Sequence, residues 1–411
     1  MIYDDINEKK EVNTYIKISK IIKFIVILYL IFFIIINLIY YNINYISKLK
    51  FLISYLQSQN DFKKNDIFGK FCKNNKLKKI RNFKKINNPK ISIISPLHNR
   101  ERYILRFIKC IQNQNFKDIE IILVDDFSID NTVKIIERFK KKDERIILIK
   151  NKKNKGTFIS RNLGVLYAKG NYVVLPDPDD ILSKNILSIC YKYAQKYKYE
   201  IIRFNMYTGN GKITLNNILN NIENGPIYQP NLVSYLFYGN NELDKIDYHI
   251  CNKLIKTEVY IRAVNSINNY YLNMYIIYRD DSIINYMIYR TAKSFYFIKR
   301  IGYYYIINSL SVTNNLFPKS NLRIKFAFIL LKIIFEYSKN SKYEKDMFNF
   351  LFTIFEKKFN IGQKLSAFAH NIHFFYNIID IYIKSKYITK ENKYILQNFK
   401  EILKKYKSQI I

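Results

Sequence analysis

The stretch PKISIISPLHNRERYILRFIKCI, residues 89–111, decides the fold of this chain. Its apolar run Ile91–Ile94 is short and bounded by polar residues, which is typical of a buried strand. Apolar side chains then recur at helical spacing between Tyr103 and Ile111. A buried strand that leads directly into an amphipathic helix is the first unit of an α/β fold.

The same alternation continues along the next part of the chain. Further strands are predicted at Ile121–Val124, Ile146–Ile149 and Tyr172–Leu175. One intervening helix carries Val133, Ile136 and Phe139, and another runs through Arg161–Leu166. Strands that alternate with helices predict βαβ units and a mostly parallel sheet.

Polar residues follow three of these predicted strands, where ligands bind in such sheets. They are His98, Asn99 and Arg100 after the first strand, Asp125 and Asp126 after the second, and Asp177, Asp179 and Asp180 after the fourth. Carboxylates crowded at the end of an apolar strand repel one another, and a divalent cation is their natural compensator. Oxygen ligands without nearby His or Cys suit Mg²⁺ or Mn²⁺, which complete their shell with substrate phosphates. The alternative is a helix N-terminus, starting at Ile181, whose dipole favours acidic residues.

Four blocks in order, ISIISPLHN, ILVDDFSIDNT, GTFISRNLG and YVVLPDPDDIL, resemble the nucleotide-sugar half of family 2 inverting glycosyltransferases. Two later blocks, HICNKLIKTEVY and IGYYYIINSLSVT, extend the resemblance over residues 90–313. The resemblance implies a GT-A fold, Rossmann-like, with a mostly parallel sheet flanked by helices. It divides this domain into a nucleotide-sugar half, residues 90–200, and an acceptor half, residues 201–313.

The resemblance also implies which residues bind the nucleoside-diphosphate sugar. These donor-binding residues are Pro96, His98, Asn99, Asp125, Asp126, Arg161, Asp177 and Asp179. Asp126 is expected to accept a hydrogen bond from the base, and Arg161 to approach the base or the diphosphate. Gly164 is expected to allow close helix packing. Two alternatives stay open, namely that Asp125 caps the following helix and that Arg161 is an ordinary surface side chain.

Metal binding and base catalysis are assigned to two acidic pairs by the same resemblance. Asp180 and Asp179 are the implied metal residues for Mn²⁺ or Mg²⁺, with Asp177 supporting the loop. The catalytic pair is Asp280 and Asp281 in YRDDSIINY, with Asp281 as the general base that deprotonates the acceptor. The alternative for Asp281 is an N-cap of a helix at Ile283–Tyr289.

The sequence departs from the family pattern at four positions. His98 replaces a usual Tyr, Phe127 and Pro178 replace small residues, and Asp280 replaces a usual Glu. The leading hypothesis is transfer of a sugar to a hydroxyl of a glycan, protein or lipid acceptor. Two rival hypotheses remain: a polyprenyl-phosphate acceptor, and a membrane-tethered binding protein with the fold but without turnover.

An N-terminal anchor is predicted from the run FIVILYLIFFIIINLIYY, residues 24–41, which is about long enough to cross a bilayer. The predicted organisation is a tail (1–20), a transmembrane anchor (21–41), a basic stem (42–89), the GT-A domain and a C-terminal helical region (314–411). We therefore expect a single-pass membrane protein of the endoplasmic reticulum, Golgi or another endomembrane, with the side of the catalytic domain left open.

The composition is strongly basic, with 68 Lys and Arg against 33 acidic residues and a formal charge of +35. We interpret this excess mainly as a background bias, because Lys is scattered among many Ile, Asn and Tyr residues. No zinc-finger or RNP-type pattern is found, so nucleic acid is not an expected partner. The four cysteines form no C-x-x-C pair.

Overall fold

The computed structural model describes residues 82–208, 213–214, 226–239, 247–306, 321–359 and 372–388, with single positions between 390 and 401. The predicted tail and anchor, and nearly all of the stem, lie outside these ranges, and so those parts stay predictions. Within the described ranges, no helix is both long and apolar enough to cross a membrane.

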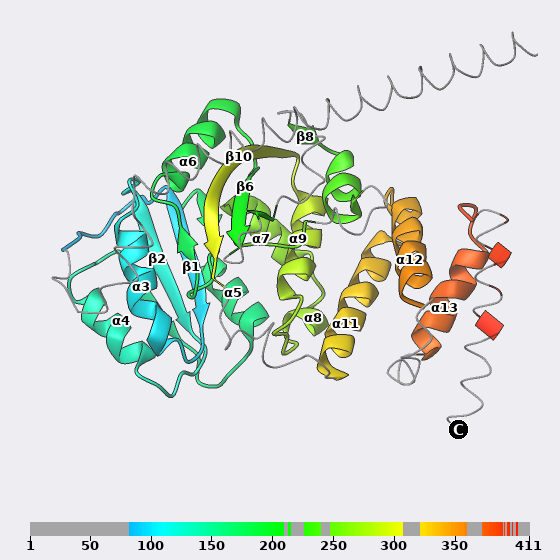
Figure 1. The fold of residues 1–411 in the computed structure, drawn as a ribbon, viewed down its shortest axis with the longest axis horizontal. Helices are drawn as coiled ribbons and strands as arrows, with labels where there is room; N and C mark the ends of the chain where they lie inside the picture. The colour runs from blue at the N-terminus through cyan, green and yellow to red at the C-terminus, as the bar shows by residue number, and fades with distance from the viewer. Residues whose placement is uncertain are drawn as a thin grey trace, which may run out of the picture. The chain divides into compact units, whose positions relative to one another are not determined.

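Ten strands among the described residues form one sheet (Figure 1). The strands are β1 (Ile91–Leu97), β2 (Ile119–Asp125), β3 (Ile146–Lys150), β4 (Tyr172–Val174), β5 (Ile181–Leu182), β6 (Ile201–Thr208), β7 (Ile213–Thr214), β8 (Ile227–Tyr228), β9 (Lys253–Lys256) and β10 (Ser294–Tyr305). Their order is β3-β2-β1-β4-β9-β6-β10-β5, with β7 on β6 and β8 on β10. Strands β3, β2, β1, β4, β6 and β10 run in one direction, and β9 and β5 oppose them. The predicted mostly parallel sheet is thus confirmed.

The register of the central strands brings the predicted ligand-binding residues to one edge. β1 pairs with β2 so that Leu97 lies opposite Asp125, and β2 pairs with β3 so that Asp125 lies opposite Lys150. His98 and Asp126 therefore leave the sheet at the same level. Every residue of β1 and β2 is buried, as expected for parallel strands covered on both faces.

Helices cover both faces of this sheet. They are α3 (Glu101–Gln112), α4 (Thr132–Lys140), α5 (Thr157–Leu166), α6 (Ile186–Tyr197), α7 (Thr257–Asn265), α8 (Asn269–Leu272), α9 (Asp280–Thr291), α11 (Asn321–Ser338), α12 (Glu344–Phe359) and α13 (Ile372–Ile383), with a π-helix at Val233–Phe237. Figure 1 shows α3 and α4 on one face and α5, α7 and α9 beyond the other. The segment after Asp180 is strand β5 rather than the expected helix start at Ile181, because its backbone pairs with β10.

Helix α5 lies unusually close to the sheet because of Gly164. A Cβ at this position would be 2.4 Å from Cγ2 of Ile94 and 3.1 Å from Cγ2 of Val124. Both partners are completely buried. The close helix packing predicted for Gly164 is confirmed, and it fixes the helix that carries Arg161.

A buried ion cluster ties α9 to the acceptor side of the sheet. The carboxylate of Asp247 lies 3.1 Å from Nε of Arg203 on β6 and 3.2 Å from Nζ of Lys253 on β9. Tyr289 of α9 donates its hydroxyl to the same carboxylate oxygen at 2.8 Å. Charges buried this deeply are tolerated only when paired, and so the cluster fixes α9 relative to β6 and β9.

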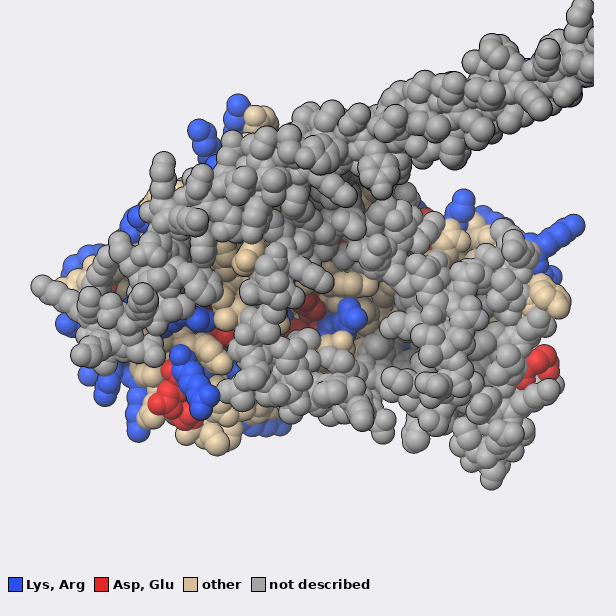
Figure 2. Space-filling model, viewed as in Figure 1, with Lys and Arg blue, Asp and Glu red and all other residues tan. Residues whose placement is uncertain are grey.

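The described residues after position 320 include helices α11, α12 and α13 and the turns next to them. On α9, the Tyr286 hydroxyl contacts Oγ of Ser338, the last residue of α11. Tyr238 also reaches Ser338, at 2.7 Å. The first of these helices therefore packs against the acceptor half. Among the described residues that Figure 2 leaves visible, Lys and Arg side chains appear at several separate places.

The close contact at Gly164 gives a stability prediction. Changing Gly164→Val should lower the free energy of unfolding by about 1–3 kcal/mol, because the new methyl groups overlap buried side chains of β1 and β2. Urea unfolding measures this change. Leu166→Val, at an exposed position of the same helix, is the control and should change stability by less than about 0.5 kcal/mol. Equal unfolding midpoints for the Gly164→Val variant and the wild type would contradict the close packing.

Candidate active site

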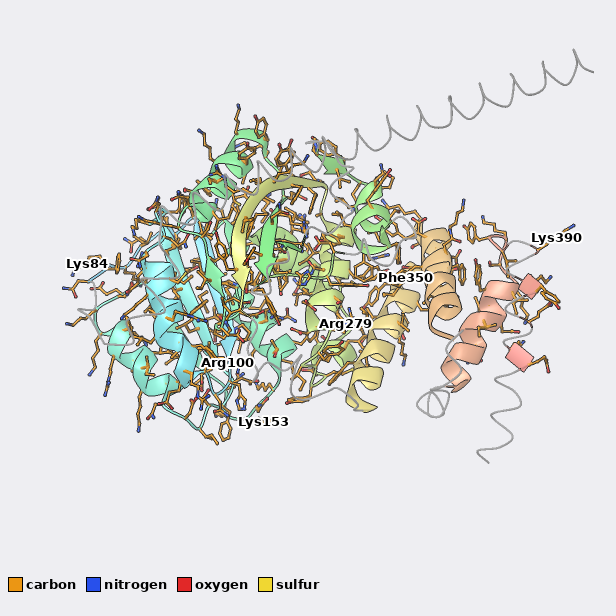
Figure 3. All side chains as sticks on the ribbon, viewed as in Figure 1. Lys84, Arg100, Lys153, Arg279, Phe350 and Lys390 are labelled. Carbon is orange, nitrogen blue, oxygen red and sulfur yellow. The ribbon has the colours of Figure 1, made fainter. Side chains whose placement is uncertain are left out.

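The predicted site residues gather at the carboxyl ends of β1, β2 and β4 and at the start of α9. Figure 3 shows Arg100 and Lys153, which follow β1 and β3, at the same edge of the sheet. The segment before α9 supplies Arg279, which adopts a left-handed conformation with φ of 63°. The edge therefore combines loops of the nucleotide-sugar half with the first turn of a helix from the acceptor half.

His98 is the centre of a polar network after β1. Its Nδ1 lies 2.9 Å from the backbone oxygen of Asp126, so this nitrogen carries the proton and donates it. Nε2 then accepts from the side-chain amides of Asn99 and Asn154, each at 3.3 Å. The predicted pair His98 and Asn99 is thus brought to the expected edge. Pro96 lies within β1 and is buried there.

The carboxylate of Asp126 holds the loop after β3. One of its oxygens accepts from Nδ2 of Asn151 and from the backbone N–H of Lys155, and the other from the backbone N–H of Gly156, all at 2.8 Å. The side chain is 3% exposed. Three donors within the protein therefore already bind the Asp126 carboxylate, which the resemblance expects to bind the nucleobase of the donor.

The neighbouring Asp125 is also buried but is less fully hydrogen-bonded. Its Oδ2 accepts from the backbone N–H of Ser128 at 3.2 Å, whereas its Oδ1 has no partner among the described residues. The following helix α4 begins only at Thr132, with Asn131 as its cap residue, so Asp125 does not cap it. An unsatisfied buried acceptor is uncommon and calls for a physical explanation.

The acidic block after β4 contains one deeply buried carboxylate and two more accessible ones. Asp180 is 2% exposed and accepts from the Tyr303 hydroxyl at 2.6 Å and the Ile306 backbone N–H at 2.7 Å. The Tyr303 hydroxyl also accepts from the backbone N–H of Asp177 at 3.0 Å. Asp179 is partly exposed, and its backbone oxygen accepts from Arg106.

Burial and carboxylate crowding raise the pKa values of Asp177 and Asp180. Burial is the largest cause of the raised pKa of Asp177, about 6, and the charges of Asp179 and Asp280 add to it, whereas Arg161 opposes it. The pKa of Asp180 is also well above its usual range, again chiefly through burial and then through Asp179 and Asp177. Burial and the neighbouring carboxylates thus both disfavour the charged forms of Asp177 and Asp180, and a bound cation would favour them.

Arg161 joins the two halves of the domain. From α5, its Nη1 pairs with the carboxylate of Asp280 on α9, and its Nη2 lies 3.2 Å from Oδ1 of Asp177. The guanidinium is buried, with a side-chain exposure of 5%. Arg161 is thus neither a surface residue nor free to move independently, because it is held by carboxylates from both sides.

Asp281 is the less constrained member of the acceptor-side pair. It is partly exposed in the first turn of α9, where its Oδ1 accepts from the backbone N–H of Ser282 at 2.8 Å. Burial raises its pKa to about 7, with a further increase from Asp280, whereas Arg161 and Arg279 lower it. The cap position of α9 is Arg279, so Asp281 is not the N-cap.

Two residues of this site were not predicted from the sequence. Tyr303 binds both the backbone of Asp177 and the carboxylate of Asp180. It lies in the block IGYYYIINSLSVT, but three consecutive tyrosines gave no means of choosing the one that turns inward. Tyr275, discussed below, lies in a segment without any recognisable motif.

The donor set fits a hard cation only in part. No group of three or more His, Cys, Asp or Glu side chains in the described part of the chain is arranged to hold a metal. Mg²⁺ and Mn²⁺ sites with one or two carboxylates, completed by water and phosphate oxygens, need no such group. Asp179 and Asp177 fit that arrangement. Asp180 fits it poorly, because both of its oxygens accept internal hydrogen bonds.

Comparison with known families identifies the class of this domain. Residues 92–264 match the sequence model of glycosyl transferase family 2. The chain therefore carries a family 2 glycosyltransferase domain, a domain of sugar-transferring enzymes. The matched range ends before α9, so the placement of Asp280 and Asp281 rests on the geometry described above.

Individual relatives match over about a quarter of this chain. Glycosyltransferase GlyG of Streptococcus pneumoniae is 32% identical over 117 residues, 28% of this chain and 39% of the relative. The GalNAc(5)-diNAcBac-PP-undecaprenol beta-1,3-glucosyltransferase of Campylobacter jejuni is 39% identical over 109 residues, 26% of this chain and 35% of the relative. In each case less than half of the relative's length is covered.

A likeness in fold extends further along the chain. The crystal structure of S. aureus TarS 1-349 in complex with UDP-GlcNAc matches with a TM-score of 0.56 at 17% identity, over 78% of this chain and 92% of that chain. This likeness shows the fold, including the arrangement of the sheet and its helices.

The bridge formed by Arg161 gives a second stability prediction. Arg161→Met should destabilise the fold by about 3–5 kcal/mol, because it leaves the carboxylate of Asp280 buried and unpaired. Combining it with Asp280→Asn should destabilise by less than the sum of the two single changes. Urea unfolding of the double-mutant cycle measures this coupling.

The control for this cycle is the exposed pair of Arg262 and Glu258, which lies one turn apart on α7. Arg262→Met should change the free energy of unfolding by less than about 1 kcal/mol, because solvent screens an exposed pair. Strict additivity of the Arg161 and Asp280 changes would show that no coupled bridge exists.

Proposed function

We propose that this chain is a metal-dependent, inverting glycosyltransferase that transfers a sugar from a nucleoside-diphosphate sugar to an acceptor hydroxyl of a glycan, protein or lipid. The observation that carries the proposal is the bridge of Arg161 between Asp177 and Asp280. It brings the acidic block of the nucleotide-sugar half next to the acidic pair of the acceptor half. A donor diphosphate and an acceptor hydroxyl would therefore meet at one place.

The base and ribose of the donor are proposed to bind beyond β1 and β2. Asp125 offers the spare carboxylate oxygen there, and we assign to it the hydrogen bond that the resemblance gives to Asp126. Asp126 would act indirectly, by holding the loop at Lys155 and Gly156. Solved structures of similar fold are described as complexes with UDP-GlcNAc and with UDP, which supports a uridine nucleotide as the first donor to test.

Asp281 is proposed as the general base. Its carboxylate is partly exposed, whereas that of Asp280 is committed to Arg161. With a pKa of about 7, Asp281 is in part ionised at neutral pH and basic enough to accept the acceptor's proton. The resulting oxygen nucleophile would attack the anomeric carbon in line with the departing diphosphate, without a covalent enzyme intermediate.

Asp179 and Asp177 are proposed to hold Mn²⁺ or Mg²⁺. A cation at this position would neutralise the charge that develops on the leaving nucleoside diphosphate. Asp180 would keep the acidic block in place through Tyr303 and the backbone of Ile306. The resemblance assigns the metal to Asp180 and Asp179, whereas we assign it to Asp179 and Asp177.

The pKa of Asp281 predicts a pH dependence of the reaction. Because only the carboxylate can accept a proton, kcat/KM should rise with pH below about 7 and level off above it. Asp281→Asn should lower kcat by about 10²–10⁴-fold and abolish this ascending limb. Glu258→Gln, at an exposed position, is the control and should leave the profile unchanged. Retained activity of the Asp281→Asn variant would instead favour an acceptor that is already anionic, such as a polyprenyl phosphate.

The assignment of the metal residues predicts different effects for two adjacent substitutions. Asp179→Asn should weaken Mn²⁺ binding by more than about tenfold, since it removes a charged oxygen ligand. Asp180→Asn should chiefly lower the unfolding midpoint, because its amide nitrogen cannot accept one of the two hydrogen bonds from Tyr303 and Ile306. Electron paramagnetic resonance of Mn²⁺, titrated with UDP present, measures the affinity. The opposite pattern would restore Asp180 as the metal ligand.

A further inference from the structure

The loop between α8 and α9 is anchored on the nucleotide-sugar half at Gly156. This glycine has φ of 88°, and a Cβ there would lie 3.0 Å from the backbone oxygen of Ile276 and 3.2 Å from the ring of Tyr275. The backbone N–H of Phe158 donates to the same oxygen of Ile276 at 3.2 Å. The loop tip therefore sits directly on the segment that Asp126 holds through the N–H of Gly156.

Tyr275 is half exposed although it contacts this buried glycine. Its exposed fraction is 51%. Its ring lies against Gly156, whose backbone N–H donates to the carboxylate of Asp126. An aromatic ring from the acceptor half thus stands at the edge where the nucleotide-sugar half is expected to receive the base.

The polar groups at this edge of the sheet are mostly bonded to one another. Asp126 accepts from three donors, and both nitrogens of His98 have partners. In Asn154, the amide nitrogen contacts His98 and the amide oxygen accepts from Gly156 at 3.1 Å. A planar ligand could therefore form few hydrogen bonds through its edge here. Its face could pack on the accessible ring of Tyr275. Base–aromatic stacking is the interaction that such a surface supports.

We propose that Tyr275 stacks on the nucleobase of the donor, so that the acceptor half supplies one wall of the donor-binding site. This inference rests on the proposed function. The stacked base would also brace the loop that leads into Asp280 and Asp281, since both follow Tyr275 closely in the chain. Donor binding would thereby position the general base before the acceptor arrives.

The test compares nucleotide and phosphate binding by the full chain. Isothermal titration calorimetry with Mn²⁺ present measures the Kd of UDP, of GDP and of inorganic pyrophosphate. Tyr275→Ala should weaken nucleoside-diphosphate binding about tenfold and leave pyrophosphate binding unchanged, because only the base meets the ring. Tyr275→Phe should bind like the wild type. Tyr270→Ala, at a 62% exposed tyrosine of α8, is the matched control and should also bind like the wild type.

Gly156→Ala provides a second variant that leaves the tyrosine in place. It pushes the loop away from its support, and should weaken UDP binding as Tyr275→Ala does. Unchanged UDP affinity in Tyr275→Ala would overturn the stacking role and leave the proposed function standing. Equal losses for UDP and pyrophosphate in that variant would also overturn it, since they indicate a merely structural side chain. A wild type that binds neither nucleotides nor pyrophosphate would refute the proposed function itself.

Discussion

The ion pairs of the buried Arg161 guanidinium are the constraint on which the active-site arrangement depends. They join Asp177, which follows β4, to Asp280, which begins α9. Burial raises the pKa of Asp177, and the guanidinium of Arg161 limits that increase. An arginine suits this role because its planar fork can bond two carboxylates at once, which a lysine ammonium does less well.

In each adjacent pair of aspartates in the site, one side chain is bound within the protein and the other is less constrained. Asp126, Asp180 and Asp280 are bound by internal donors or by Arg161, and they hold loops and helices in place. Their neighbours keep capacity for a ligand: Asp125 has an unpartnered oxygen among the described residues, and Asp179 and Asp281 are partly exposed. One carboxylate of each pair therefore holds the local structure, while its neighbour has the more accessible or unpartnered oxygen.

Much of the fold could be predicted from the chain's hydrophobic pattern. The strands at Ile91, Ile121, Ile146 and Tyr172 and the helices between them follow from apolar runs and helical spacing. For Ile181–Leu182 the sequence indicated only the alternative of a helix start. The strand there was missed because it pairs with β10, which is far away in the chain. The sequence also could not predict which aspartate of each pair is bound within the protein. The donors to Asp180, for example, lie more than a hundred residues away in the chain.

The sequence by itself determined the α/β alternation, the edge at which polar residues collect and the family resemblance, because local periodicity and short motifs encode these features. Only the tertiary structure decided which carboxylate faces inward, that Arg161 bridges the two halves and that Tyr275 lies against Gly156. Burial and long-range pairing determine such contacts, and both depend on the packing of segments that are remote in sequence.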